Sequence, residues 1–341
     1  MTQKMKMAGL LLLMLLFTAC SQYSLGERAI VRALYLNKTG DAMYEAKLLV
    51  VKVEPSAEAG SWKEEIVCID GSGDTLLEAL TKAENKENGQ AFYGQNEVLL
   101  LGPELSGNEL FTTCRFLEKE TRGRPNTAVY QFDCDSDIWS GPNLSDLLQD
   151  IQQIEESGYF KSNLYELSSV DSGILPGLSF TDQHTEKSGL TFYFDNTKQG
   201  QWIGEQADLA ALLKGQNQDF HLIFQLENSP VKFNICSPKL CYKVEGEADT
   251  IRLNITIYGR ITGFVSDSND ELSVPIVDEI NRRIEQILIS IVQDSFEKQN
   301  DIFQFTSWFQ NQNADQVQHL KQKGTFWDSK RITFTSCLQA L

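Results

Sequence analysis

Hydrophobic residues in the first half of the chain form short runs that are separated by turn residues and amphipathic segments. The β-branched run 44–53 and the apolar run 97–101 each predict a strand. Thr75, followed three residues later by Glu78, is typical of a capped helix N-terminus. A further helix is expected over 107–120. The order of these elements indicates a mixed α and β architecture.

Strand patterns dominate the second half of the chain. Residues 251–257 alternate between aliphatic and polar side chains, which predicts a strand with one buried and one solvent-facing side. Pro275 begins an amphipathic pattern that predicts a long helix to about Gln299, and its isoleucine stripe is expected to be core rather than a partner-binding surface. We therefore expect an α+β, multi-domain fold with mixed or antiparallel sheets covered by helices, and a long amphipathic helix in the C-terminal domain.

A change of composition in the middle of the chain suggests a domain division. Residues 173–187 are rich in Ser, Gly and Thr and contain Pro176, which is the composition of a linker. The expected organisation is therefore a signal peptide (1–20), an N-terminal α+β domain (21–172), a linker (173–187) and a C-terminal α+β domain (188–341).

The N-terminus has the pattern of a secretory signal. An apolar run over 8–17 follows Lys4 and Lys6, and it is too short to cross a bilayer, which takes about 20 apolar residues. Phe17-Thr18-Ala19-Cys20 resembles the lipobox of bacterial lipoproteins, so Cys20 is the expected site of a diacylglycerol anchor. A plain cleavable signal and a buried N-terminal helix are the alternatives.

The charge of the chain restricts its partners. The precursor has a formal net charge of −17, and cleavage of the signal segment before Cys20 takes away Lys4 and Lys6 and no acid, which gives about −19. Such a surface argues against nucleic-acid binding, which uses clustered Lys and Arg. It should also be repelled by an anionic leaflet, so we expect membrane attachment to rest on the lipid rather than on a basic patch.

Six cysteines remain besides Cys20, and their disulfide state is open because six cysteines allow 15 pairings. Cys236 and Cys241 flank a turn signal at Ser237-Pro238, and either a bridge or two ordinary strand cysteines fits that spacing. The six are Cys68, Cys114, Cys134, Cys236, Cys241 and Cys337.

Patterns that carry chemistry are weak in this sequence. The segment 70–73 leads into a helix but lacks the Lys of a phosphate loop, and the acidic run 133–139 lacks the Gly and Glu of a calcium loop. The histidines have no metal-ligand spacing: His184, His221 and His319. We therefore expect a non-enzymatic protein with no cofactor and no metal site.

The order of several motifs resembles one known family. After the lipobox come "GDTLLEALTKA", "GQAFYGQNEVLLLGPEL", "SNLYELSSVDSGILPGL", "GLTFYFDNTKQGQWIGEQADLAALLKG", the long helix after Pro275, and "NDIFQF". This series is similar in order and spacing to the Ger(x)C lipoproteins, the C subunits of bacterial spore germinant receptors, over nearly the whole chain after Cys20.

Individual positions carry this resemblance. They are Thr75, Glu78 and Ala79 of a turn-then-helix motif, Gly94 with 98–102 of a strand motif, Leu164, Tyr165 and Glu166 of an "LYE" motif, Pro176, and Asp301 with Phe303 of a "DIF" motif.

The resemblance implies a non-catalytic subunit held by Cys20 on the extracytoplasmic face, the outer surface of the inner spore membrane. Such a subunit works beside a membrane A subunit and a transporter-like B subunit, and nutrient binding by the complex triggers germination. It also implies a multi-domain α+β fold. The sequence does not indicate whether this subunit binds a small molecule.

Two other functions share some of these features. A substrate-binding lipoprotein of a nutrient transporter would have the same anchor, acidity and two domains, but more regular βαβ alternation. An envelope hydrolase would require a catalytic carboxylate.

Overall fold

The structure is a computed structural model of the 341-residue chain. It describes residues 29–40, 43–55, 62–86, 91–120, 122–134, 136–140, 144–181, 184–215, 219–226, 229–246, 252–265, 273–296, 298, 301–324, 326 and 328–340.

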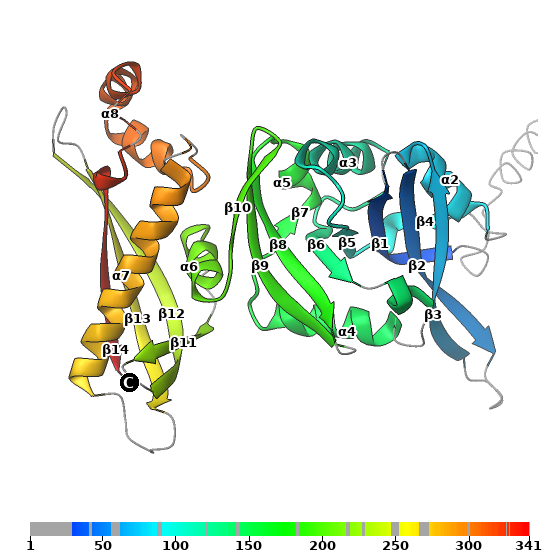
Figure 1. The fold of residues 1–341 in the computed structure, drawn as a ribbon, viewed down its shortest axis with the longest axis horizontal. Coiled ribbons are helices and arrows are strands. Elements are labelled where there is room, and N and C mark those ends of the chain that lie inside the picture. Colours follow the sequence, from blue (N-terminus) through cyan, green and yellow to red (C-terminus); the bar gives the residue numbers. More distant parts are fainter. Residues whose placement is uncertain are drawn as a thin grey trace, which may run out of the picture.

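Two lobes lie side by side along the long axis of the molecule (Figure 1). The N-lobe, residues 29–202, is built on a large sheet, and the C-lobe, residues 205–340, is built on a small one. Both sheets are mixed and both are covered by helices, so the predicted α+β, multi-domain fold is confirmed.

Ten strands of the described part form the large sheet: β1 (Ala29–Thr39), β2 (Met43–Pro55), β3 (Trp62–Gly73), β4 (Ala91–Phe92), β5 (Val98–Leu101), β6 (Ala128–Cys134), β7 (Ser162–Asn163), β8 (Gly173–Thr181), β9 (His184–Phe194) and β10 (Thr197–Trp202). Their main order is β10-β9-β8-β6-β5-β1-β2-β3. The pairs β1–β5, β5–β6 and β6–β8 are parallel, and the two ends of the sheet are antiparallel.

Helices cover both faces of this sheet. They are α2 (Leu76–Glu84), α3 (Gly107–Lys119), α4 (Leu144–Glu156) and α5 (Leu164–Ser168). Leu34 and Leu36 of β1 pack in the cluster with α2, α3 and α5, whereas Ala33 and Tyr35 pack in the cluster with α4. Central strands are therefore apolar on both sides, which explains the continuous run Val98–Leu101.

Local capping begins the helices where the sequence predicted. The Thr75 hydroxyl accepts a hydrogen bond from the Glu78 N–H at the start of α2. The segment 70–73 that precedes it ends β3, where Gly71 allows α2 to pack closely: a Cβ at this position would lie 2.2 Å from the Ala79 carbonyl oxygen. The segment thus has a packing role in the structure.

The segment expected to be a linker is part of the large sheet. Residues 173–187 lie mostly in β8 and the start of β9, and β8 pairs with both β6 and β9. Its small residues permit close packing rather than flexibility, since a Cβ on Gly177 would lie 2.4 Å from the Ser188 hydroxyl oxygen. The large sheet therefore extends through the expected division at residue 172.

The C-lobe contains a small sheet in the order β11-β12-β13-β14, in which only the β13–β14 pair is parallel. Its elements are β11 (Phe220–Leu226), β12 (Ser229–Glu245), β13 (Arg252–Val265), β14 (Ile332–Ala340), α6 (Glu205–Leu213), α7 (Val274–Phe296) and α8 (Phe305–Gln322). The alternation in β13 is as predicted, because Leu253, Ile255 and Ile257 are fully buried.

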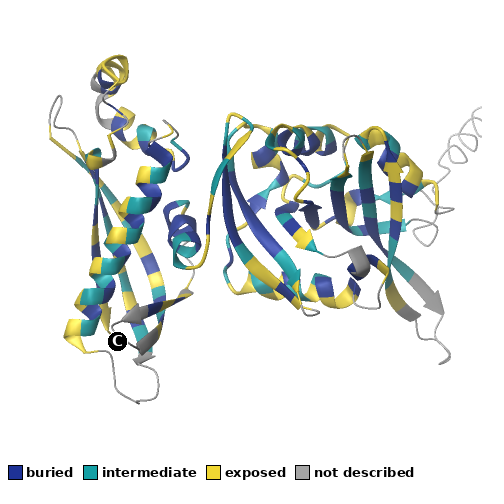
Figure 2. Ribbon diagram, in the orientation of Figure 1, coloured by how far each residue is buried: buried dark blue, intermediate teal, exposed yellow. Residues whose placement is uncertain are grey.

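The long predicted helix is α7, and its stripe is core. Ile280, Ile284 and Ile291 are fully buried in the same cluster as the small sheet. Figure 2 shows buried and exposed positions alternating along α7.

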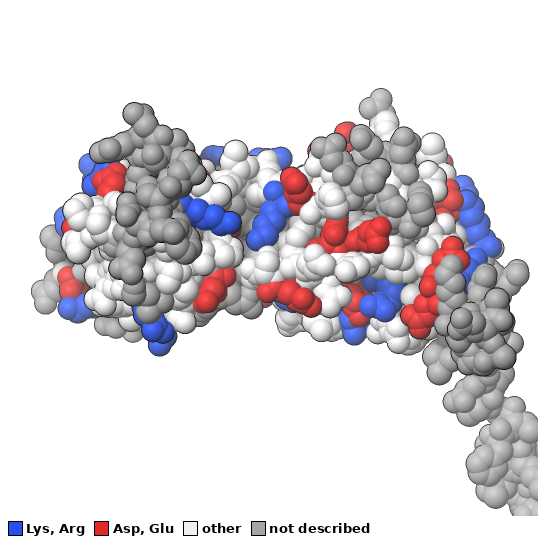
Figure 3. Space-filling view, turned by 90° about the horizontal axis from the view of Figure 1, so that it is seen from below, with Lys and Arg blue, Asp and Glu red and all other residues white. Residues whose placement is uncertain are grey.

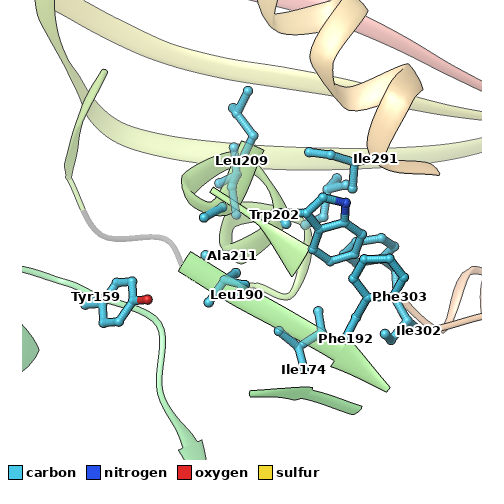
Figure 4. Packing of buried hydrophobic residues seen from close by; sticks show 14 of the residues in the cluster. Tyr159, Ile174, Leu190, Phe192, Trp202, Leu209, Ala211, Ile291, Ile302 and Phe303 are labelled. Atoms are coloured by element: carbon cyan, nitrogen blue, oxygen red, sulfur yellow. The ribbon is translucent and has the colours of Figure 1, made fainter. Parts of the chain in front are cut away.

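A stack of aromatic rings joins the lobes (Figure 4). The fully buried Trp202, at the end of β10, stacks on Phe192 of β9 with centroids 4.2 Å apart, and on Phe303 of the C-lobe at 5.7 Å. Its indole N–H donates to the Asp294 carboxylate of α7 at 3.2 Å. The surrounding cluster is continuous from the α4 side of the large sheet, through β9, to α6, α7 and the small sheet. The lobes thus share one core.

A buried carboxylate lies at the same junction. Burial raises the pKa of Asp208 on α6 to about 6, a shift that Lys187 of β9 and His221 oppose and Glu205 reinforces. Burial likewise lowers the pKa of Lys187, and its ammonium lies 5.0 Å from the centre of the Tyr159 ring.

Trp202→Ala should uncouple the lobes. We expect a loss of about 3–5 kcal/mol in the free energy of unfolding, because a fully buried indole leaves a cavity. In calorimetry the single unfolding transition expected for a shared core should separate into two. The matched control is Trp308→Ala, since Trp308 is 39% exposed on α8 away from the junction. A Trp202→Ala protein that unfolds in one transition at the original midpoint would contradict a shared core.

Asp208→Asn should stabilise the protein at neutral pH. The folded-state pKa of about 6 exceeds the ordinary value of about 3.9, so the stabilising contribution of the protonated carboxyl is present below about pH 4 and is lost as the pH rises through 6. The gain from Asn should be about 1–3 kcal/mol at pH 7.5 and near zero below pH 4.

Urea unfolding of both proteins across this pH range measures that gain. Asp315→Asn, which changes an exposed carboxylate on α8, is the control and should have little effect. Destabilisation by Asp208→Asn at pH 7.5 would mean that attraction to Lys187 outweighs the cost of burial.

Candidate functional site

The predicted lipidation site, Cys20, lies outside the described residues. No helix in the described ranges is long and apolar enough to cross a bilayer. The same ranges hold no His, Cys, Asp and Glu cluster able to bind a metal, and His184, His221 and His319 occur on separate elements.

A cavity of about 660 Å³ opens between the two lobes. The N-lobe contributes the residues that follow α4, the exposed side of α5 and the start of β8, and the C-lobe contributes the loop after α6 and the residue before α8. Clefts of this size at domain junctions are common binding sites. Its lining residues include Glu155, Glu166, Val170, Lys214, Gly215 and Gln304.

Lys214 is the central basic group of this cleft. It caps the C-terminus of α6, and its ammonium donates to the Ile302 carbonyl at 3.1 Å. Burial lowers its pKa, and the carboxylates of Glu166 and Asp301 oppose that shift. The lysine therefore lies in the field of one acid from each lobe.

This arrangement brings together three motifs that are far apart in the sequence. Glu166 belongs to the "LYE" motif on α5, Lys214 ends the "ADLAALLKG" segment, and Asp301 begins the "DIF" motif. Phe303 of the last motif is also the C-lobe ring in the Trp202 stack. The motif residues thus both join the lobes and line the cleft between them.

Asp301 has a structural task as well. Its two carboxylate oxygens accept hydrogen bonds from the backbone N–H groups of Phe305 and Thr306, both at 2.6 Å, which caps α8. Gln304, beside it, has a left-handed backbone with φ of 59° and lines the cleft. The DIF segment therefore sets the start of α8 against the cleft.

On the N-lobe side of the cleft, the carboxylate of Glu155 is already paired. Glu155 of α4 accepts from the Tyr130 hydroxyl at 2.9 Å and pairs with the Lys161 ammonium at 3.4 Å. Burial, and then the charge of Glu155, raise the pKa of Tyr130. This carboxylate is held by its neighbours rather than left available as an acid or base.

The rim of the cleft has exposed apolar side chains beside its charges. Tyr165 is 59% exposed and Val170 is 41% exposed, both at the α5 side. Lys and Arg side chains lie on both sides of the waist between the lobes (Figure 3). Such a surface suits binding of a polar ligand or a partner segment, and its described residues form no nucleophile–base pair.

Of these three charges, Glu166 and Asp301 are positions of the family resemblance, whereas Lys214 was not predicted as an individual residue. Lys-Gly after an apolar helical run is a helix C-terminus signal, which was the available clue. The other positions of the resemblance have structural roles: Thr75 caps α2, and Pro176 lies in β8.

No disulfide joins the six described cysteines. Cys236 and Cys241 lie on the same strand, β12, on either side of a bulge at Ser237-Pro238. Of the two possibilities left open for this pair, the structure has two strand cysteines.

Comparisons with known proteins agree with the fold and the motifs. Residues 21–178 match the family model of the spore germination protein N-terminal domain, and residues 189–336 match that of the spore germination B3/GerAC-like C-terminal domain. A search of curated proteins gave no match.

One solved structure is similar over most of its length. The crystal structure of the GerBC protein superposes with a TM-score of 0.56 at 12% sequence identity, covering 90% of this chain and 96% of that one. At this identity the likeness concerns the fold, whereas the two family matches together span both lobes. The chain belongs to the Ger(x)C family of spore germination proteins.

Proposed function

We propose that this protein is the lipid-anchored, non-catalytic C subunit of a spore germinant receptor and acts with membrane A and B subunits in nutrient-triggered germination. The observation that carries the proposal is the match of both lobes, in chain order, to the two family models. The GerBC-like fold over 90% of the chain supports it.

The proposed location is the outer surface of the inner spore membrane. Cys20, at the end of the signal-like segment, would carry the diacylglycerol, and the described lobes would lie outside the bilayer. Two acyl chains give stable anchoring, whereas one chain gives only marginal binding.

A non-catalytic role fits the chemistry of the cleft. Three charged groups in or beside the cleft serve the fold: Glu155 is paired, Lys214 donates to the Ile302 carbonyl, and Asp301 caps α8. These contacts favour a cleft that transmits or receives a contact between subunits over one that turns over a substrate.

A substrate-binding lipoprotein of a transporter is the second candidate, because a cleft of about 660 Å³ between two lobes is what such a protein would use. Against it, the small sheet is mainly antiparallel instead of being built from βαβ units.

The test is a tagged pull-down from detergent-solubilised spore membranes, comparing the wild type with Cys20→Ala by mass spectrometry. We expect two multi-spanning membrane proteins with the wild type and a loss of about tenfold or more with the variant, because the anchor concentrates the subunit at the membrane. Cys68→Ala, which changes a partly buried cysteine on β3, is the matched control and should behave as the wild type.

Recovery of an ABC permease in place of these two proteins would favour the transporter candidate. Equal recovery of the same partners with Cys20→Ala would remove the anchor from the proposal while leaving the receptor assignment intact.

A further inference from the structure

The two faces of the small sheet have opposite character. One face is core: Phe233, Ile235 and Ile257 are fully buried in the shared cluster, Arg283 of α7 lies over the Phe224 ring, and Trp308 of α8 stacks on Tyr242. The strand alternation directs the intervening side chains to the other side. We call that side the outer face.

The outer face is open to solvent in the described structure. Its residues on the four strands pair across the sheet, for example Lys239 with Tyr258 and Tyr258 with Cys337. Tyr258 is 46% exposed and Ile223 is 53% exposed. The remaining exposed residues of this face are His221, Lys232, Lys239, Cys241, Lys243, Glu245, Arg252, Arg260, Thr335 and Gln339.

The outer face is basic although the chain as a whole is strongly acidic. Three lysines of β12 and two arginines of β13 stand against two described carboxylates, Glu245 of β12 and Asp219, which precedes β11 and accepts from the Ser237 N–H at 2.7 Å. The basic residues are Lys232, Lys239, Lys243, Arg252 and Arg260. Glu245 pairs with Lys243 at 2.6 Å and accepts from Asn254 at 2.7 Å. Among described residues, the other four basic groups have no carboxylate within ion-pair distance.

This concentration contrasts with a formal net charge of −17 for the chain. The acidic residues of the three segments that adjoin β12 and β13 lie outside the described residues: Glu227, Glu247, Asp249, Asp267, Asp270 and Glu271. The stretch of β12 from Lys232 to Lys243 extends for about 35 Å at about 3.3 Å per residue, so the basic groups are spread over a long face rather than gathered in a pocket.

The composition of the face favours a lipid surface over a folded protein. The centres of protein interfaces are depleted in Lys and enriched in aromatic residues, Met and Arg. This face has three Lys beside its two Arg, and only Tyr258 and Ile223 as exposed large apolar groups. Anionic headgroups attract every Lys and Arg that comes near the membrane surface, and Tyr is enriched at headgroup depth.

We propose that the outer face of the small sheet binds the surface of membranes that contain anionic phospholipid. Lys232, Lys239, Arg252 and Arg260 contact the headgroup phosphates, and the exposed Thr335 hydroxyl on β14 adds a hydrogen bond. The binding chemistry does not depend on the proposed receptor role. If Cys20 is lipidated, the face supplies a second, salt-sensitive contact, in the lobe that does not contain the first described strand, β1.

The experiment is sedimentation of the chain from Ser21 onward, which contains every described residue and lacks the lipid. The vesicles are phosphatidylcholine alone or with about 40 mol% phosphatidylglycerol. We expect binding to the anionic vesicles only, and its loss between about 50 and 500 mM NaCl as the charges are screened. Lys239→Glu/Arg260→Glu should lower the partition coefficient by about tenfold or more.

The matched control is Lys119→Glu/Lys198→Glu, which makes the same change in net charge at exposed positions of the N-lobe. It should lower binding much less than the outer-face variant. If the reversed charges disturb folding, as judged by the circular dichroism melting midpoint, Lys239→Gln/Arg260→Gln replaces them, with an expected loss of about threefold or more.

Equal binding to both kinds of vesicle, or an equal loss in the control, would overturn the proposal. An absence of vesicle binding would also overturn the proposal. If the outer-face variant then lost its membrane-protein partners in the pull-down, the face would be a protein-docking surface. The lipid-free chain carries no anchor and no partner, so failure here leaves the proposed receptor function standing.

Discussion

The aromatic stack at Trp202 is the constraint on which the arrangement of the molecule depends. Its ring lies between Phe192 of the N-lobe and Phe303 of the C-lobe, and its N–H is held by Asp294. Because the stack belongs to one continuous core, neither lobe can move without opening buried apolar surface. The cleft beside it is therefore a fixed feature of the fold and not a gap between independent domains.

The same junction explains why motifs scattered along the chain belong together. Glu166 on α5 and Asp301 before α8 lie on opposite lobes, and both act electrostatically on Lys214. Asp301 also caps α8, and its neighbour Phe303 enters the stack. A change in any of these groups would disturb the packing between the lobes as well as the cleft.

Charge is distributed unevenly over this acidic protein. A net value of −17 averages over surfaces of opposite sign, because the alternation in β12 and β13 collects basic side chains on one side of the small sheet and aliphatic ones on the other. The expectation that an anionic leaflet repels the protein follows from the average. The outer face follows from the pairing of two strands, and net charge contains no information about that pairing.

The sequence by itself determined the local elements, the fold class and the family. Continuous apolar runs such as Val98–Leu101 form strands buried on both sides, and Thr75 caps its helix. The alternation at Leu253, Ile255 and Ile257 gave the buried side of β13. These features depend on neighbours within a few residues, so the local pattern is sufficient to predict them.

Only the tertiary structure decided how the lobes are joined and where the cleft lies, because both features depend on residues that are far apart along the chain. The Ser- and Gly-rich residues 173–187 have the composition of a linker, yet β8 is fixed by pairing with β6, whose position the local sequence does not specify. Likewise, no local pattern places Lys214 between Glu166 and Asp301, or Trp202 between rings of two lobes. Long-range strand pairing and the shared core create these contacts, and with them the cleft.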